Sequence, residues 1–166
     1  MRARNFVAAV GLVAVGVIVG WISAPGGDAA AAGALMSDDY AGIEQLYWRY
    51  NHGADFRDGA LFVSAFADDA EFNVGQQTLR GKDELMAWRM ERHAGQTGDT
   101  GRRHWNNGWR ILPTGDGAEA RVYWILVDVS GGQPNTVASG YYDDEYVKTP
   151  DGWRIKTRKI NSDRSM

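Results

Sequence analysis

The 166-residue chain contains no cysteine. Disulfide bonds, cysteine-ligated zinc, iron–sulfur clusters, a thiol nucleophile and an acylated lipoprotein anchor are therefore excluded. Positive charge is also in the minority, because the chain has 18 Lys and Arg residues and 21 Asp and Glu residues, which gives a formal net charge of -3. A chain with this charge balance is a poor match for the nucleic-acid backbone, and we expect no nucleic-acid partner.

Motifs for common cofactors are missing as well. The three histidines, His52, His93 and His104, lack the regular short spacing of a metal site. No G-x-G-x-x-G loop, phosphate loop or G-x-S-x-G elbow occurs. We therefore expect neither a metal ion nor a cofactor, so any chemistry must come from ordinary acid–base side chains.

The first 36 residues differ in kind from the rest. Two arginines near the start precede an uncharged apolar run over residues 6–22, and a segment rich in Ala and Gly follows. This order is typical of an export signal, and the run also reaches the lower length limit of a membrane span. We predict that residues 1–22 are a signal peptide or an N-terminal membrane anchor and that residues 23–36 are a linker.

The folded part would then be extracytoplasmic: secreted, periplasmic, or tethered to the membrane through residues 6–22 if the signal is not cleaved. The alternative is that translation starts at Met36, which would make the protein cytosolic. Both readings leave residues 37–163 as one domain, which is long enough to bury a core.

The first half of this domain has helical patterning. Ser37 is a good N-cap, and Gly53 is expected to end or loosen a helix, which predicts a helix between them. Apolar residues recur at i, i+3, i+4 and i+7 within it, at Ile43, Leu46, Tyr47 and Tyr50. A short second helix is predicted to follow the cap residue Asp58 and to end at Asp68 and Asp69. A short strand is predicted at residues 70–74, and a third helix opens at Gly81.

After Gly101 the pattern changes to a period of two. Residues 102–112, 118–129, 136–148 and 152–160 are rich in strand-forming residues and are separated by Gly- and Pro-containing turns. Helices followed by long antiparallel strands predict an α+β domain rather than alternating βαβ units.

Several segments then resemble known sequences. Residues 47–58 and 66–70, the stretch Arg-His-Trp-Asn-Asn at 103–107, and the segments 140–144 and 152–155 resemble, in this order, SnoaL-like domains of the nuclear transport factor 2-like superfamily. The resemblance implies a cone-shaped α+β fold in which a curved antiparallel sheet packs on three N-terminal helices and encloses an apolar pocket. It also implies a small hydrophobic molecule as the partner. Relatives include cyclases, dehydratases and isomerases, and others that only bind ligands or dimerise, so the function depends on the site.

Asp55 and His104 are the candidate catalytic residues. Asp55 matches an aspartate at the pocket mouth of scytalone dehydratase, and His104 matches a histidine that pairs with that aspartate. Imidazole is the side chain best suited to acid–base chemistry at neutral pH. The alternative roles are structural: Asp55 could cap the next helix together with Asp58, and His104 could be a satisfied core residue.

Tyr50, Asn106 and Tyr123 are the candidate substrate-binding residues, because their polar groups can hold a substrate oxygen. His104 and Asn106 share one strand face, and alternation alone leaves open whether that face or the opposite one lines the pocket. Asp143 is a reserve base. His93, at the end of the third helix, is expected to complement the helix dipole.

Two other groups are expected in solvent. His52 lies near the polar side of the first helix, and the basic residues at 154–159 are interpreted as a solvated face rather than a nucleic-acid patch.

Departures from the relatives narrow the chemistry. Val74 stands where ketosteroid isomerase carries its general base, and Ala54 stands where the dehydratase carries a tyrosine. Only the Asp–His pair therefore carries over. The sequence supports two functions: a cofactor-free lyase or isomerase, or a non-catalytic ligand-binding or dimerisation module. The second function predicts that Asp55 and His104 lie beyond hydrogen-bond reach.

A homodimer is expected under either function. The aromatic residues Trp105, Trp109, Tyr141 and Trp153 lie on predicted long strands, and exposed aromatic groups there would need cover.

Overall fold

The computed structural model describes residues 33–163. The predicted signal or anchor at residues 1–22 and most of the predicted linker lie outside this range. No helix within the described range is long and apolar enough to cross a membrane.

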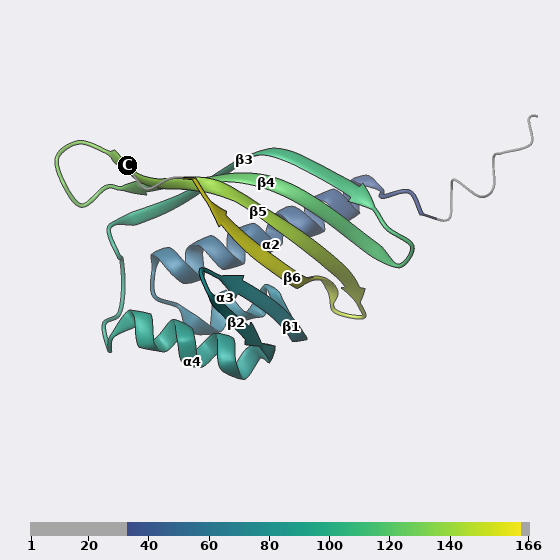
Figure 1. Ribbon diagram of the computed structural model, residues 1–166, viewed down its shortest axis with the longest axis horizontal. Coiled ribbons are helices and arrows are strands. Elements are labelled where there is room, and N and C mark those ends of the chain that lie inside the picture. The colour runs from purple at the N-terminus through teal and green to yellow at the C-terminus, as the bar shows by residue number, and fades with distance from the viewer. Residues whose placement is uncertain (1–32, 164–166) are drawn as a thin grey trace, which may run out of the picture.

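A six-stranded sheet and three helices make up the domain. The elements are α2 (Ser37–Asp55), α3 (Gly59–Ser64), β1 (Phe66–Val74), β2 (Gln77–Arg80), α4 (Gly81–His93), β3 (Arg102–Pro113), β4 (Gly117–Asp128), β5 (Asn135–Thr149) and β6 (Gly152–Ser162). The strand order is β2-β1-β6-β5-β4-β3. Figure 1 shows the long strands β3 to β6 curving over α2, with α3 and α4 beside the short hairpin of β1 and β2. The predicted α+β cone is confirmed.

One pair of strands is parallel. β1 runs parallel to β6, whereas all other neighbours are antiparallel, so the sheet is mixed. β1 also begins at Phe66, earlier than the short strand expected at residues 70–74, because Asp68 and Asp69 point outward and continue the strand. This early start carries the chain from the helices directly onto the edge of the long strands.

Helix α2 starts with Met36 at the N-cap, one residue before the expected cap Ser37. Asp39 in the first turn accepts a hydrogen bond from the Met36 backbone N–H at 2.9 Å, which satisfies a free donor of the helix start. The same carboxylate receives Lys148 Nζ at 2.6 Å and Trp153 Nε1 at 3.0 Å. These donors, Lys148 first, lower the pKa of Asp39 to about 2. Asp39 thereby ties the helix to β5 and β6.

Gly53 lies inside α2 rather than at its end. The helix continues through Asp55, and the Cα of Gly53 packs against the backbone of Phe62 in α3. A Cβ at position 53 would lie 2.6 Å from Phe62 Cα, which is too close for any side chain. The glycine is therefore a packing requirement where two helices cross, and the helix-ending role expected from the sequence is wrong.

A buried ion pair occupies the centre of the core. Arg158 and Asp144 are both fully inaccessible at their side chains, and Arg158 donates to Asp144 through Nε at 2.9 Å and Nη2 at 2.6 Å. Tyr47 and Tyr146 donate their hydroxyls to the same carboxylate at 2.5 and 2.9 Å. Burial raises the pKa of both tyrosines well above the ordinary value, so both stay protonated donors.

This ion pair departs from two sequence-based expectations. The basic cluster at residues 154–159 was expected to lie in solvent, but Arg158 in its middle points into the core. The reserve base Asp143 pairs instead with Arg121 on β4 at 2.7 Å, on the outer face. Strand alternation explains both, because adjacent residues of β5 and β6 face opposite sides of the sheet.

The inner face of the sheet carries His104 and Asn106. His104 on β3 lies opposite Leu126 on β4, and Asn106 lies opposite Trp124, whose side chain is buried. The outer face carries Trp105 and Tyr123, which are 60% and 59% exposed. Trp153, expected on the outer face, is instead buried against α2.

Candidate functional site

The last turn of α2 places a carboxylate beside the first residues of β3. Asp55 is 3% exposed, and the adjacent residues Gly53 and Ala54 are also buried. The backbone carbonyl of Asp55 accepts the N–H of Thr100 at 2.8 Å, which fixes the chain immediately before β3. Arg57 reinforces this link by donating to the carbonyls of Gly98 and Asp99 at 3.2 and 2.6 Å. These bonds hold the end of α2 against the start of β3.

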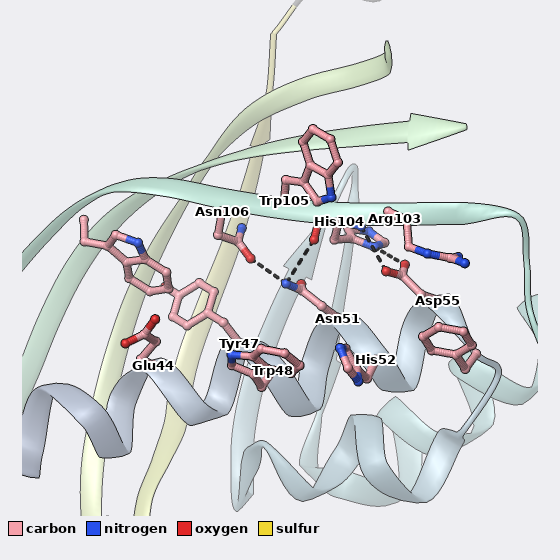
Figure 2. Close-up of a pocket in the computed structure, with 12 residues that line it drawn as sticks. Glu44, Tyr47, Trp48, Asn51, His52, Asp55, Arg103, His104, Trp105 and Asn106 are labelled. Atoms are coloured by element: carbon pink, nitrogen blue, oxygen red, sulfur yellow. Dashed lines mark hydrogen bonds and ion pairs between the residues drawn. The ribbon is translucent and has the colours of Figure 1, made fainter. Parts of the chain in front are cut away.

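Both oxygens of the Asp55 carboxylate contact His104. Oδ2 accepts the backbone N–H of His104 at 3.0 Å, and Oδ1 lies 2.5 Å from the imidazole Nδ1. Figure 2 shows the pair where α2 ends beneath β3. An ionised carboxylate can only accept, so the favoured tautomer has its proton on Nδ1 and a lone pair on Nε2. A lone pair fixed in this way is what a general base requires.

Asn51, one turn before Asp55, continues the polar row along α2. Its Nδ2 donates to Asn106 Oδ1 at 2.6 Å and to the carbonyl of His104 at 3.4 Å. The Oδ1 of Asn51 is buried and has no hydrogen-bond partner among the described residues. The two amides therefore support the strand that carries His104.

Two hollows flank the Asp–His pair. The first, which we call the aromatic cleft, lies between α2 and β3, has a volume of about 440 Å³ and is drawn in Figure 2. Its lining comprises Glu44, Tyr47, Trp48, Asn51, His52, Asp55, Phe56, Arg103, His104, Trp105, Asn106 and Trp109.

The second hollow, the inner cavity, lies between the helices and the inner face of the sheet. It has a volume of about 570 Å³, and its lining also includes both members of the pair. The remaining lining residues are Tyr50, Ala54, Arg57, Val74, Trp88, Arg89, Arg92, His93, Thr100, Arg102, Leu126 and Ile160. Both volumes are in the range of small-molecule sites.

The structure separates the three predicted substrate-binding residues. Tyr50 lies in the wall of the inner cavity, is 4% exposed, and has its pKa raised by burial. Asn106 lies in the aromatic cleft. The prediction for Tyr123 is wrong, because Tyr123 lies on the outer face of β4 and lines neither hollow. Its ring instead covers Gly108, where a Cβ would meet Cδ2 of the tyrosine.

His93 does not serve the helix dipole as expected. It is 3% exposed and accepts a hydrogen bond from Arg89 Nε at its own Nε2, at 3.0 Å. Burial, with the neighbouring Arg89 and Arg57 charges, lowers the pKa of His93 below its ordinary value. The residue is therefore neutral at physiological pH, and Arg89 carries the positive charge at this helix end.

His52 is a cleft residue that the sequence did not place. It was expected in solvent, but its ring packs against Trp48 at 4.5 Å and Phe56 at 5.7 Å between ring centroids. The spacing of Trp48, His52 and Phe56, each four residues apart on α2, was the available signal. Within residues 33–163, no group of three or more His, Asp or Glu side chains is arranged to hold a metal ion.

Comparisons with known proteins agree with this architecture. A family model described as a SnoaL-like domain matches residues 36–159. No curated protein matches the chain. A solved structure of a protein of unknown function with a cystatin-like fold from Nostoc punctiforme has a TM-score of 0.70 and 23% identity, over 80% of this chain and 96% of that chain.

Two further structures are similar. An NTF2-like protein with a cystatin-like fold from Novosphingobium aromaticivorans has a TM-score of 0.62 and 23% identity, covering 74% of this chain and 80% of that chain. ActVI-ORFA from Streptomyces coelicolor has a TM-score of 0.65 and 22% identity, covering 75% and 97%. At these identities the structures show the fold alone. Because the family model matches most of the chain, the protein belongs to the SnoaL-like domain family, whose members are small-molecule-binding or isomerase- and cyclase-type domains.

Proposed function

We propose that this protein is a cofactor-free lyase or isomerase that acts on a small, hydrophobic, oxygenated molecule bound in the inner cavity. His104 is its general acid–base and Asp55 positions His104. The observation that carries the proposal is the engagement of both Asp55 carboxylate oxygens by the same histidine. The ring bond fixes the orientation and the tautomer of the imidazole, and the backbone bond holds its strand beside the carboxylate.

The reaction that suits this pair is the loss of water from a β-hydroxyketone. His104 Nε2 removes the proton next to the carbonyl, and the C–H electron pair forms the new C=C bond as the C–O bond breaks. The imidazolium then returns its proton to the departing hydroxide, which leaves as water. Tyr50, which stays protonated, and the apolar residues Val74, Leu126 and Ile160 line the cavity beside the pair, and polar contacts are stronger next to such apolar groups than in bulk water.

Turnover of two bicyclic β-hydroxyketones tests this proposal. The probes are 3-hydroxy-1-tetralone and a ring-carboxylated form of it, whose dehydration gives a fluorescent naphthol. We expect His104→Gln to lower the rate by about 10²–10⁴-fold, the usual contribution of a general base. His52→Gln, which alters a histidine of the aromatic cleft outside the inner cavity, is the control and should keep the rate.

If neither probe is converted by the wild-type protein, or if His104→Gln turns over at the wild-type rate, the catalytic proposal is wrong. The second function, a binding module without turnover, then gains support. Its own structural prediction is already wrong, since Asp55 Oδ1 and His104 Nδ1 lie 2.5 Å apart.

The outer face of the sheet supports a homodimer as a further part of the proposal. Trp105, Tyr123, Ile125 and Val137 lie on three neighbouring strands and are 60%, 59%, 41% and 38% exposed. A second copy of the chain would cover this surface. Sedimentation equilibrium should show a dimer that Trp105→Lys converts to a monomer, and a monomeric wild-type protein would contradict this.

Export is also proposed, from the composition of residues 1–36 alone. A fusion of these residues to a reporter enzyme that is active only outside the cytoplasm tests it. We expect activity that is lost when Leu12 and Val15 of the apolar run at residues 6–22 are replaced by arginine in the fusion. An inactive fusion whose reporter protein stays in the cytoplasm would contradict export and favour translation from Met36.

A further inference from the structure

The inner cavity carries more positive charge than its own acid can balance. Four arginines line it, Arg57, Arg89, Arg92 and Arg102, whereas Asp55 is its one carboxylate. Asp55 is already engaged by His104. Within residues 33–163, none of the four guanidinium groups forms an ion pair with Asp or Glu.

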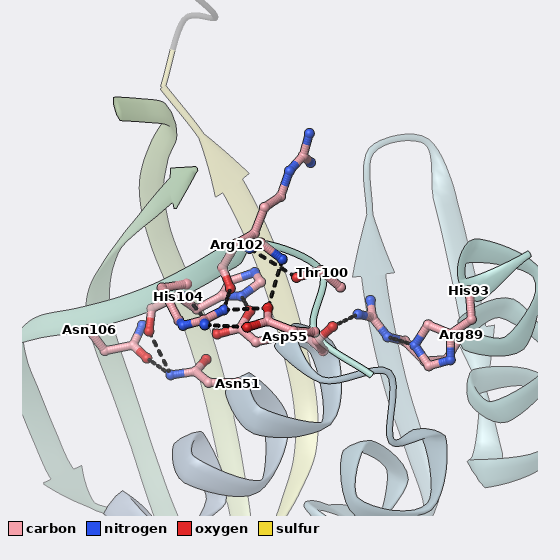
Figure 3. Close-up of polar contacts among 12 residues, drawn as sticks. Asn51, Asp55, Arg89, His93, Thr100, Arg102, His104 and Asn106 are labelled. Atoms are coloured by element: carbon pink, nitrogen blue, oxygen red, sulfur yellow. Dashed lines mark hydrogen bonds and ion pairs between the residues drawn. The ribbon is translucent and has the colours of Figure 1, made fainter. Parts of the chain in front are cut away.

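Arg89 is the most buried of the four. Its Nε donates to His93 Nε2 at 3.0 Å and its Nη2 donates to the carbonyl of Ala54 at 2.7 Å, so both partners are neutral acceptors. Figure 3 shows Arg89 between the end of α2 and His93. Burial lowers the pKa of Arg89, and an unpaired guanidinium in such a place costs free energy unless an anion joins it.

Arg92 lies one turn from Arg89 on the same helix. Its guanidinium stacks on the ring of Trp88 at 3.8 Å and has no hydrogen bond among the described residues. Arg57 differs, because its guanidinium already donates to the loop carbonyls of Gly98 and Asp99. Arg89 and Arg92 are therefore the two cationic groups of α4 that a ligand can engage.

Apolar residues form one wall of the cavity. Val74, Leu126 and Ile160 come from β1, β4 and β6, and Tyr50 adds an aromatic wall from α2. A molecule that fits both parts needs an apolar body and an anionic end. We propose that the inner cavity binds an organic carboxylate, with the carboxylate against Arg89 and Arg92 and the apolar body against the sheet. The inference rests on the proposed function in one respect: it takes an organic acid to be the class of substrate on which the proposed enzyme acts.

A matched pair of ligands tests the inference. The probes are 2-naphthoate and 2-naphthamide, which have nearly the same shape and differ in charge. Their affinities for the full domain are measured by isothermal titration calorimetry. We expect 2-naphthoate to bind more tightly by about tenfold or more, because hydrogen bonds to charged groups are the stronger class. Higher salt should weaken the binding of 2-naphthoate selectively.

Two variants localise the effect. Arg92→Gln should remove most of the preference for 2-naphthoate and leave 2-naphthamide binding unchanged. Arg110→Gln is the matched control, since Arg110 is an exposed arginine on β3 outside this cavity, and it should keep the preference. Equal affinity for the two probes, no binding of 2-naphthoate at millimolar concentration, or a preference that survives in both Arg89→Gln and Arg92→Gln would overturn the inference.

The outcome is separable from that of the proposed function. Selective binding of 2-naphthoate without conversion of either tetralone probe would leave this inference standing and remove the catalytic proposal. Conversion of the uncharged tetralone with no preference for 2-naphthoate would leave the catalytic proposal standing and remove this inference.

Discussion

Asp55 holds His104 by both its backbone and its ring. One carboxylate oxygen accepts the His104 N–H at 3.0 Å and the other lies 2.5 Å from Nδ1. The backbone bond sets the position of β3 against α2, and the ring bond sets the tautomer. These two effects can be separated by substitution, because an amide can keep the first and not the second.

Asp55→Asn should therefore lower turnover of the tetralone probes by about 10²–10⁴-fold while the fold is kept. The asparagine carbonyl can still accept the His104 N–H, but the side chain no longer carries the charge that keeps the proton on Nδ1. The measurement is the initial rate of naphthol formation, with circular dichroism as a check on folding. Asp58→Asn, which keeps a good N-cap on α3, should retain the rate, and equal rates in both variants would refute the positioning role.

The core ion pair leads to a prediction about stability. Asp144→Asn should lower the free energy of unfolding by about 3–5 kcal/mol, because it leaves the buried Arg158 guanidinium without a counter-charge. Urea unfolding followed by tryptophan fluorescence measures the change. Asp143→Asn is the matched control, since the Asp143 carboxylate pairs with Arg121 at the surface, and it should change stability little. Similar losses in the two variants would contradict the buried role of Asp144.

The double variant Asp144→Leu with Arg158→Met tests the same point in the opposite direction. Removing both charges leaves no buried ion unpaired, so this variant should be more stable than Asp144→Asn alone. A double variant that is as unstable as Asp144→Asn would show that the tyrosine hydroxyls around Asp144, rather than the charges, account for the loss.

Close packing at the crossing of α2 and α3 predicts the effect of a single methyl group. Gly53→Ala should lower the free energy of unfolding by about 1–3 kcal/mol, the usual cost of overpacking, because the new Cβ would meet the backbone of Phe62. Urea unfolding is again the measurement. Gly131→Ala in the β4–β5 loop, where a Cβ meets nothing within 4 Å, is the control and should be nearly neutral. If Gly53→Ala leaves the free energy of unfolding unchanged, α3 can shift away from α2 without cost, which would contradict the prediction.

The sequence predicted the fold well because the fold depends on periodicity. The change from helical to strand patterning after Gly101 and the four long strands are local signals, and each strand lies within about two residues of its expected bounds. β2 was missed because its four residues carry no alternation of burial. The pairing of Asp55 with His104 could be inferred only from the resemblance, since no local rule joins residues 49 positions apart.

Three predictions about single residues were wrong for another reason. Tyr123, Arg158 and His93 were each assigned from residue type, as a pocket tyrosine, a surface cation and a dipole partner. Their true environments depend on which strand or helix face turns inward, and that is decided by packing against distant elements. Arg158 is buried because Asp144, Tyr47 and Tyr146 come from other elements to meet it, and none of these contacts is visible in the local sequence.

The buried histidine of α4 gives a pH dependence of stability that can be measured. Unfolded His93 takes up a proton near its ordinary pKa of 6.5, whereas in the folded protein burial, with the Arg89 and Arg57 charges, keeps the pKa below that value. Above pH 6.5 neither state holds the proton and the residue adds no pH dependence. As the pH falls below 6.5 only the unfolded state gains the proton, so stability falls by at most about 1.4 kcal/mol per pH unit.

His93→Gln should therefore show a shallower loss of stability than the wild-type protein between pH 6.5 and 5, measured by urea unfolding at each pH. The two proteins should show parallel curves above pH 7.5, and parallel curves over the whole range would mean that His93 accepts a proton in the folded state as easily as in the unfolded one.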